Sequence, residues 1–303
     1  MSTPMGPRVA LHHSTSYRYD RPVSLSPHEV RLRPAPHSRT PILAYSLSVA
    51  PSSHFINWQQ DPYGNHVARL VFTEATRELS VTVDLVADMT AINPFEFFIE
   101  LDAEVFPFRY SEPLQVDLTA YTRPEPAGPL LESWIDSMRA EVLAHPLRTT
   151  QFLVALNQRL SRDIRYLERM EPGVQTAEDT LALGCGSCRD SAWLLIQVLR
   201  RLGLGARFVS GYLIQLHPSA ATSAGPADPD PDSDRADLHA WAEVYIPGAG
   251  WIGLDPTSGL LVGEGHIPLA CSAVTGSAAP VSGRADPADV LFRHEMRVTR
   301  LHP

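Results

Sequence analysis

Three side chains of the types used in nucleophilic catalysis occur in the second half of the chain, in the order Cys188, His239 and Asp255. Cys188 follows Ser187 where a glycine-rich turn becomes an apolar run with basic residues only at its end, over residues 184–202. This pattern predicts a buried helix beginning at Cys188, where unpaired backbone N–H groups and the helix dipole favour a thiolate. Because the thiolate is the reactive form of cysteine, Cys188 is a candidate nucleophile.

A cysteine nucleophile needs a base nearby and a third group that orients the base. Residues 239–246 and 251–255 alternate as strands do, and the PGAG sequence between them predicts a hairpin. A hairpin pairs the ends of its strands, so His239 and Asp255 are expected to lie side by side. A carboxylate there would stabilise the imidazolium, which in turn stabilises a thiolate. From spacing alone, three alternatives stay open: Cys188 as a buried apolar residue, His239 as a core residue and Asp255 as a turn residue.

The elements that must position these residues form an α+β plan behind a β-rich N-terminal part. Residues 9–85 alternate with period two between frequent turns, which is typical of a β-sandwich or barrel-like domain. Residues 93–129 are rich in aromatics and prolines and suit a linker. Helices are expected to start near residues 129, 150 and 176, and further strands are expected over residues 206–216 and 291–301. The expected domains are residues 1–105 as the β-rich domain, 106–148 as linker and first helix, and 149–303 as the core with a C-terminal strand.

Composition restricts the class of protein and its partners. The 303 residues are 44% hydrophobic, enough for two domains with cores, and carry a net charge of -9. That charge argues against nucleic-acid and anionic-membrane partners, and no stretch has the length of a membrane span. The first residues lack the apolar region of a signal peptide, and three cysteines cannot form a disulfide framework. A cytoplasmic protein is expected.

The two cysteines Cys185 and Cys188 also satisfy the CxxC pattern of zinc and redox sites. A zinc site needs a second ligand pair at short spacing, and a redox site needs a preceding apolar strand. Neither is present, so Cys185 is expected to be a structural neighbour. No metal or cofactor is predicted.

An acidic loop, residues 217–237, leads into His239. It lacks the glycine and glutamate of a calcium loop, whose positions hold Ser233 and His239. We expect a solvated loop that borders the site and disfavours acidic substrates. The alternating acidic residues are Asp228, Asp230, Asp232 and Asp234.

Four blocks of sequence resemble the core motifs of the bacterial transglutaminase-like superfamily, which is related to papain-type cysteine peptidases. They span residues 152–259 in the order and separation typical of that family. Residues 1–105 are similar to the N-terminal domain that often precedes this core, through YRY at 17–19 and DPYGN at 61–65. The four blocks are GSCRDSA at 186–192, RFVSGY at 207–212, HAWAEVY at 239–245 and GWIGLDPT at 250–257.

The resemblance implies a papain/transglutaminase-like core, with helices packed on an antiparallel sheet. It implies Cys188 as nucleophile, His239 as general base and then acid, and Asp255 as the orienting carboxylate. The expected oxyanion donors are the Cys188 N–H and, as a weaker candidate, Tyr166. Trp241 lies two residues from His239 on the same strand face and is a candidate cleft residue.

The expected reaction is acyl transfer from a peptide or protein amide through a thioester on Cys188. Hydrolysis of peptide or isopeptide bonds is favoured because water is the default acceptor. Protein-glutamine crosslinking is the alternative reaction. A non-catalytic binding module on the same fold is the alternative class. The sequence leaves the substrate, the acceptor and the oligomeric state open.

Overall fold

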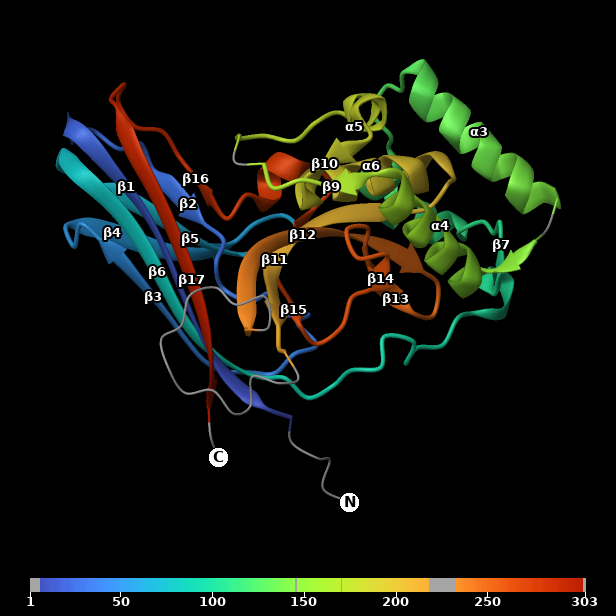
Figure 1. The fold of residues 1–303 in the computed structure, drawn as a ribbon, viewed down its shortest axis with the longest axis horizontal. Coiled ribbons are helices and arrows are strands. Elements are labelled where there is room, and N and C mark those ends of the chain that lie inside the picture. Colours follow the sequence, from blue (N-terminus) through green and yellow to red (C-terminus); the bar gives the residue numbers. More distant parts are fainter. Residues whose placement is uncertain (1–5, 145, 170, 218–232, 302–303) are drawn as a thin grey trace.

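Two four-stranded antiparallel sheets form the left part of the molecule in Figure 1. The computed structural model describes residues 6–144, 146–169, 171–217 and 233–301. The first sheet has the order β17 (Val290–Leu301), β1 (Arg8–Val23), β6 (Thr76–Asp88), β3 (Ile42–Ala50). The second has the order β16 (Val281–Ser282), β2 (His28–Val30), β5 (His66–Phe72), β4 (His54–Gln60).

These sheets share one apolar core, as the period-two pattern predicts. Val81, Val83 and Leu85 of β6 are buried in the same cluster as Val30 of β2 and Leu70 of β5. Each such side chain contributes roughly 1.5–3 kcal/mol when it is fully buried. The predicted β-sandwich is therefore confirmed.

The C-terminal strand differs from the sequence-based expectation. β17 pairs along its length with β1, with Arg8 opposite Leu301 and Tyr19 opposite Val290. It therefore belongs to the N-terminal sandwich, and its assignment to the core over residues 149–303 is corrected. An alternating strand carries no local sign of which sheet it will join, because pairing depends on the rest of the fold.

The third sheet carries the helices of the core. Its order is β14 (Leu260–Leu261), β13 (Gly250–Asp255), β12 (Arg235–Ile246), β11 (Ala206–Gln215), β15 (His266–Ser272), with antiparallel pairing throughout. Helix α6 (Cys188–Arg201) packs on one face of it, and Ala192 and Leu195 are buried with Ala242 and Val244 of β12. The α+β core is as expected. The other main helices are α3 (Pro129–Ala144), α4 (Thr149–Asp163) and α5 (Ala177–Leu183).

Short elements occupy the connections between these layers. The stretch expected to be a plain linker in fact holds a 3-10 turn, one short strand and two short helices. None of the helices in the described part of the chain is both long and apolar enough to cross a membrane. The short elements are η1 (Leu101–Ala103), β7 (Val105–Phe106), α1 (Glu112–Asp117), α2 (Thr119–Thr122), β8 (Leu147–Arg148), β9 (Arg165–Tyr166), β10 (Cys185–Gly186) and η3 (Thr275–Ala278).

The face of the third sheet opposite α6 packs against the sandwich. Tyr212 and Ile214 of β11, with Ile267 and Leu269 of β15, are buried in the core cluster of the two N-terminal sheets. Sandwich and core thus share apolar contacts, and the third sheet lies between the sandwich and the helices (Figure 1).

Candidate active site

The N-terminus of α6 is fixed by a capping box around Ser187. The Ser187 backbone N–H donates to Asp190 Oδ2 at 2.8 Å, and its hydroxyl donates to the same oxygen at 2.7 Å. Cys188 is the first residue of the helix and is 9% exposed. Its backbone N–H points out of the helix N-terminus, where it has no intrahelical acceptor.

Asp190 ties this helix start to the preceding loop. Arg169 donates to both carboxylate oxygens, at 3.0 and 3.1 Å, and the Gln175 N–H donates at 2.7 Å. Burial alone would raise the pKa of Asp190, but the hydrogen bonds from Arg169, Gln175 and Ser187 lower it. A Cβ on Gly186 would lie 2.8 Å from the Asp190 Cβ, so the turn before Cys188 requires glycine.

The β12–β13 hairpin brings His239 and Asp255 together. Its register pairs Ala242 with Leu254 and Ile246 with Gly250. His239 Nε2 lies 3.2 Å from Asp255 Oδ2. The expectation that these two side chains lie side by side is met.

Asp255 is 1% exposed and accepts hydrogen bonds at both carboxylate oxygens. Thr257 donates to Oδ1 from its backbone N–H at 2.9 Å and from its hydroxyl at 2.7 Å. Ser258 donates to Oδ2 at 3.0 Å, and Asn157 of α4 donates to the Asp255 backbone C=O at 3.1 Å. Burial alone would raise the pKa of Asp255, whereas the bonds from His239, His266 and Thr257 hold it far below its ordinary value.

Cys188 interacts with His239, which in turn pairs with Asp255. Burial alone would lower the pKa of His239, but hydrogen bonds with Asp255 and Cys188 raise it to about 10. Because Nε2 faces Asp255, Nδ1 is the nitrogen left to face the thiol. This arrangement favours an imidazolium beside the sulfur at neutral pH, which is the electrostatic setting for a thiolate.

The two weaker candidates, Tyr166 and Trp241, lie near different members of the site. Tyr166 is 53% exposed on β9, in register with Gly186 just before the cysteine. Its pKa is raised, first by burial and then by nearby groups that include Cys188. Trp241 is 0% exposed and stacks at 6.5 Å on the His239 ring. Trp241 packs against His239 and lines the smaller of the two pockets described below.

A second histidine, His266, joins the site, although no sequence pattern pointed to it. Its Nε2 lies 3.4 Å from Asp255 Oδ2. His239, Asp255 and His266 each place one ligand atom within 4.8 Å of the others, a spacing that also suits a metal ion. The same atoms already make ion-pair contacts, because both imidazoles face one oxygen of Asp255. We therefore treat the three residues as a hydrogen-bonded group.

Other supporting residues also escaped the sequence-based reasoning. The hydroxyls of Thr257 and Ser258 follow Asp255 directly, so a local turn motif signals them. Asn157 and His266 come from other elements, and only the folded chain places them here.

The acidic loop is described only at its edges. Asp228, Asp230 and Asp232 lie outside the described residues. Asp234 forms an ion pair with Arg300 of β17, with its Oδ2 2.7 Å from Nε. The expected effect of the loop on substrate charge stays a prediction.

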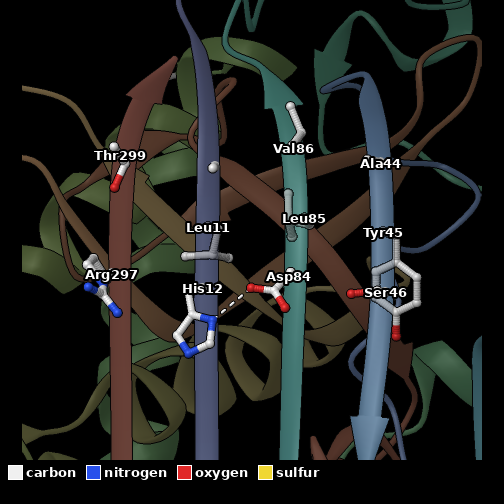
Figure 2. Close-up of a pocket in the computed structure, with 11 residues that line it drawn as sticks. Leu11, His12, Ala44, Tyr45, Ser46, Asp84, Leu85, Val86, Arg297 and Thr299 are labelled. Atoms are coloured by element: carbon white, nitrogen blue, oxygen red, sulfur yellow. Dashed lines mark hydrogen bonds and ion pairs between the residues drawn. The ribbon is translucent and has the colours of Figure 1, made fainter.

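Two of the pockets in the described part of the chain help to place the site. The larger, about 430 Å³, lies on the face of the first sheet that carries His12 and Asp84, whose Nδ1 and Oδ1 atoms are 2.7 Å apart (Figure 2). It contains no cysteine, and Cys188 lies elsewhere, at α6. The smaller pocket, about 230 Å³, is lined in part by Trp241 and His266. Trp241 packs against His239, and His266 contacts Asp255, so these two residues separate the pocket from the His239–Asp255 pair.

Comparison with known proteins agrees with this architecture. The family model described as the bacterial transglutaminase-like N-terminal region matches residues 9–88, and that of the transglutaminase-like superfamily matches residues 136–256. Uncharacterized protein Rv2569c of Mycobacterium tuberculosis is 27% identical over 274 residues, which cover 86% of this chain and 82% of that protein. Uncharacterized protein ML0607 of Mycobacterium leprae is 26% identical over 282 residues, which cover 91% and 92%.

One solved structure has the same fold. A Cytophaga hutchinsonii protein, provisionally described as a cysteine protease, matches with a TM-score of 0.70 at 20% identity, covering 98% of this chain and 91% of that one. The chain is therefore a bacterial transglutaminase-like protein, in which that family's N-terminal region precedes a core of the transglutaminase-like superfamily.

Proposed function

We propose that the chain is a cysteine-dependent enzyme that hydrolyses amide or peptide bonds through a thioester on Cys188. The observation that supports this most is the buried His239–Asp255 pair, 3.2 Å apart, whose imidazole interacts with Cys188 at the start of α6. A nucleophile, a base and an orienting carboxylate are the three groups that this chemistry needs.

The steps follow from the positions of the atoms. The Cys188 sulfur attacks the amide carbonyl carbon, and the C–S bond forms as the carbonyl oxygen becomes an oxyanion near the Cys188 backbone N–H. His239 gives its Nδ1 proton to the leaving nitrogen, and the C–N bond breaks to leave a thioester. Water then attacks while His239 takes its proton, and the C–S bond breaks to release the acid.

A peptide or protein substrate fits the strand that lies beside the cysteine. The N–H groups of Arg165 and Leu167 donate to Gly184 and Gly186 at 2.9 and 2.8 Å. The peptide groups of Tyr166 between them therefore point to the other side, where β9 has no partner strand in the described part of the chain. An extended peptide can pair with such an edge.

The experiment compares Cys188→Ala with Cys185→Ser, a matched control three residues earlier. Both thiols are free and Cys185 is the more exposed, so accessibility alone predicts faster labelling of Cys185. We expect a haloacetamide probe to label Cys188 first, and amide turnover to survive in Cys185→Ser and vanish in Cys188→Ala. Equal turnover in the two variants would overturn the nucleophile assignment.

The same assay separates the alternatives. Turnover with and without a primary amine distinguishes hydrolysis from crosslinking, because only the latter gives amine-linked product. Binding of an amide library without any turnover would indicate a non-catalytic module. Cytoplasmic localisation also stays a prediction, supported by the free thiols of Cys185, Cys188 and Cys271.

A further inference from the structure

His266 lies far from Asp255 in the sheet but touches it in space. It begins β15, which is separated from β13 by two intervening strands. The long strands β11 and β12 of this sheet are visibly bent (Figure 1). His266 Nε2 lies 3.4 Å from Asp255 Oδ2, the same oxygen that faces His239.

The hydrogen bonds of His266 define its tautomer. Its Nδ1 accepts from the Gly263 backbone N–H at 3.4 Å. The hydrogen is therefore on Nε2, and the ring donates to the Asp255 carboxylate. Oδ2 thus receives hydrogen bonds from two imidazoles and from the Ser258 hydroxyl.

Packing holds the ring in this orientation. His266 meets Trp241 edge-on, with ring centroids 5.3 Å apart and an interplanar angle of 84°. Trp241 in turn stacks on His239, so both histidines contact the same indole. A Cβ on Gly211 would lie 2.4 Å from the indole ring. Glycine at this position of β11 therefore leaves the room that the Trp241 side chain occupies.

The ring also separates Asp255 from a space behind the site. His266 and Trp241 line the pocket of about 230 Å³, whereas Asp255 and His239 do not. The imidazole thus keeps water in the pocket away from Oδ2, and a lower local dielectric strengthens the attraction between carboxylate and imidazolium. The titratable and charged groups around His266 are His239 and Asp255 on one side and Arg207, Glu243, His37 and Arg39 around the pocket.

We propose that His266 is a positioning residue of the acyl-transfer site: it donates from Nε2 to Asp255 and shields this carboxylate, so that Asp255 stays directed at His239. This inference rests on the proposed function, since it assigns His266 to the same reaction. His266 touches no reacting atom and acts through Asp255 alone.

The test uses two substitutions that differ in hydrogen bonding. His266→Gln keeps a donor near the Nε2 position, and His266→Leu fills similar volume without one. We expect His266→Leu to lower kcat about tenfold with little change in KM, the size expected for one lost bond to a charged group. His266→Gln should recover most of this loss. EDTA in all assays removes any effect of adventitious metal.

The pH dependence distinguishes positioning from simple structural support. Without the His266 donor, Asp255 takes up a proton at higher pH, so the acidic limb of the rate profile should move up in His266→Leu and not in His266→Gln. Equal kcat and superimposable profiles for wild type and His266→Leu would overturn the proposal. An equal loss of kcat in His266→Leu and His266→Gln that simply follows their loss of thermal stability would also overturn the proposal.

The rate of Cys188 alkylation against pH keeps the two proposals separable. It reports the thiolate–imidazolium pair without requiring any substrate. If wild type shows fast alkylation but no amide turnover, the proposed function fails. The role of His266 is then still tested by the difference between His266→Leu and His266→Gln in how the alkylation rate depends on pH. If alkylation is unchanged in His266→Leu at every pH, the positioning role fails whatever the substrate.

Discussion

Replacement of Asp255 by Asn removes the charge that faces His239 and keeps nearly the same shape. Asp255 Oδ2 lies 3.2 Å from His239 Nε2, in a site where both side chains are largely buried. Two unit charges at this distance attract by about 5 kcal/mol at an effective dielectric constant of about 20. Because each ~1.4 kcal/mol is tenfold in rate, we expect kcat/KM and the Cys188 alkylation rate to fall by about 10³-fold.

The amide cannot recover this loss, because Asp255 accepts hydrogen bonds on both sides. Oδ1 receives the Thr257 N–H at 2.9 Å, and Oδ2 faces His239 and the Ser258 hydroxyl. An Asn in either orientation directs its NH₂ group at one of these donors. The substitution should therefore also move the ring of His239, not only lower its pKa.

The assay follows alkylation of Cys188 between pH 5 and pH 11. Asp255 helps to raise the pKa of His239 to about 10, so in wild type the imidazolium persists up to that pH. In Asp255→Asn this pKa falls, and the alkaline limb should move to lower pH. The control is Asp84→Asn, which disrupts the exposed His12–Asp84 pair in Figure 2 and should leave activity unchanged.

The outcome that refutes this reasoning is specific. If folded Asp255→Asn keeps kcat/KM within tenfold of wild type and of Asp84→Asn, the charge of Asp255 does not support the reaction. Circular dichroism of Asp255→Asn is measured first, so that inactivity caused by unfolding is not mistaken for a loss of catalysis.

Three further predictions concern stability and the oxyanion. Asp190→Ala leaves Arg169 without its buried partner and should lower the free energy of unfolding by about 3 kcal/mol, measured by urea denaturation; an unchanged midpoint would contradict this. Tyr166→Phe should lower kcat about 10²-fold if the hydroxyl donates to the oxyanion, and full activity would exclude that role. The raised pKa of His239 gives stability that is complete below its ordinary pKa of 6.5 and is lost as the pH rises toward about 10. The melting temperature of wild type should therefore approach that of His239→Gln as the pH rises through this range. Parallel plots of melting temperature against pH for the two proteins would argue against the charged pair.

Local chemistry made the centre of the site predictable. Residues 184–202 contain a cap, a first-turn acid and an apolar face, and these act over a few residues to start α6 at Cys188. The PGAG turn fixes the register of β12 and β13, which pairs Ala242 with Leu254 and so leaves His239 and Asp255 near the same end of the hairpin. Both predictions succeed because each needs contacts only between neighbours in the chain.

Contacts between distant segments were not predictable in this way. Arg169 reaches Asp190 from a separate loop, and Asn157 reaches the Asp255 backbone from α4. Trp241, the candidate cleft residue, is fully buried and lines a pocket whose other walls come from distant segments such as those of His37 and Pro94. Their sequence surroundings are those of ordinary helix, loop and strand residues.

The sequence by itself determined which residues start α6 and which two strands form the hairpin, and so which end of each element carries Cys188, His239 and Asp255. It did not determine that α6 packs on β12, which brings Cys188 to His239. Only the tertiary structure decided that β17 joins the sandwich and that His266 donates to Asp255. The physical reason is range: capping and turn geometry act within a few residues, whereas strand partners and the curvature of a sheet depend on how the whole chain packs.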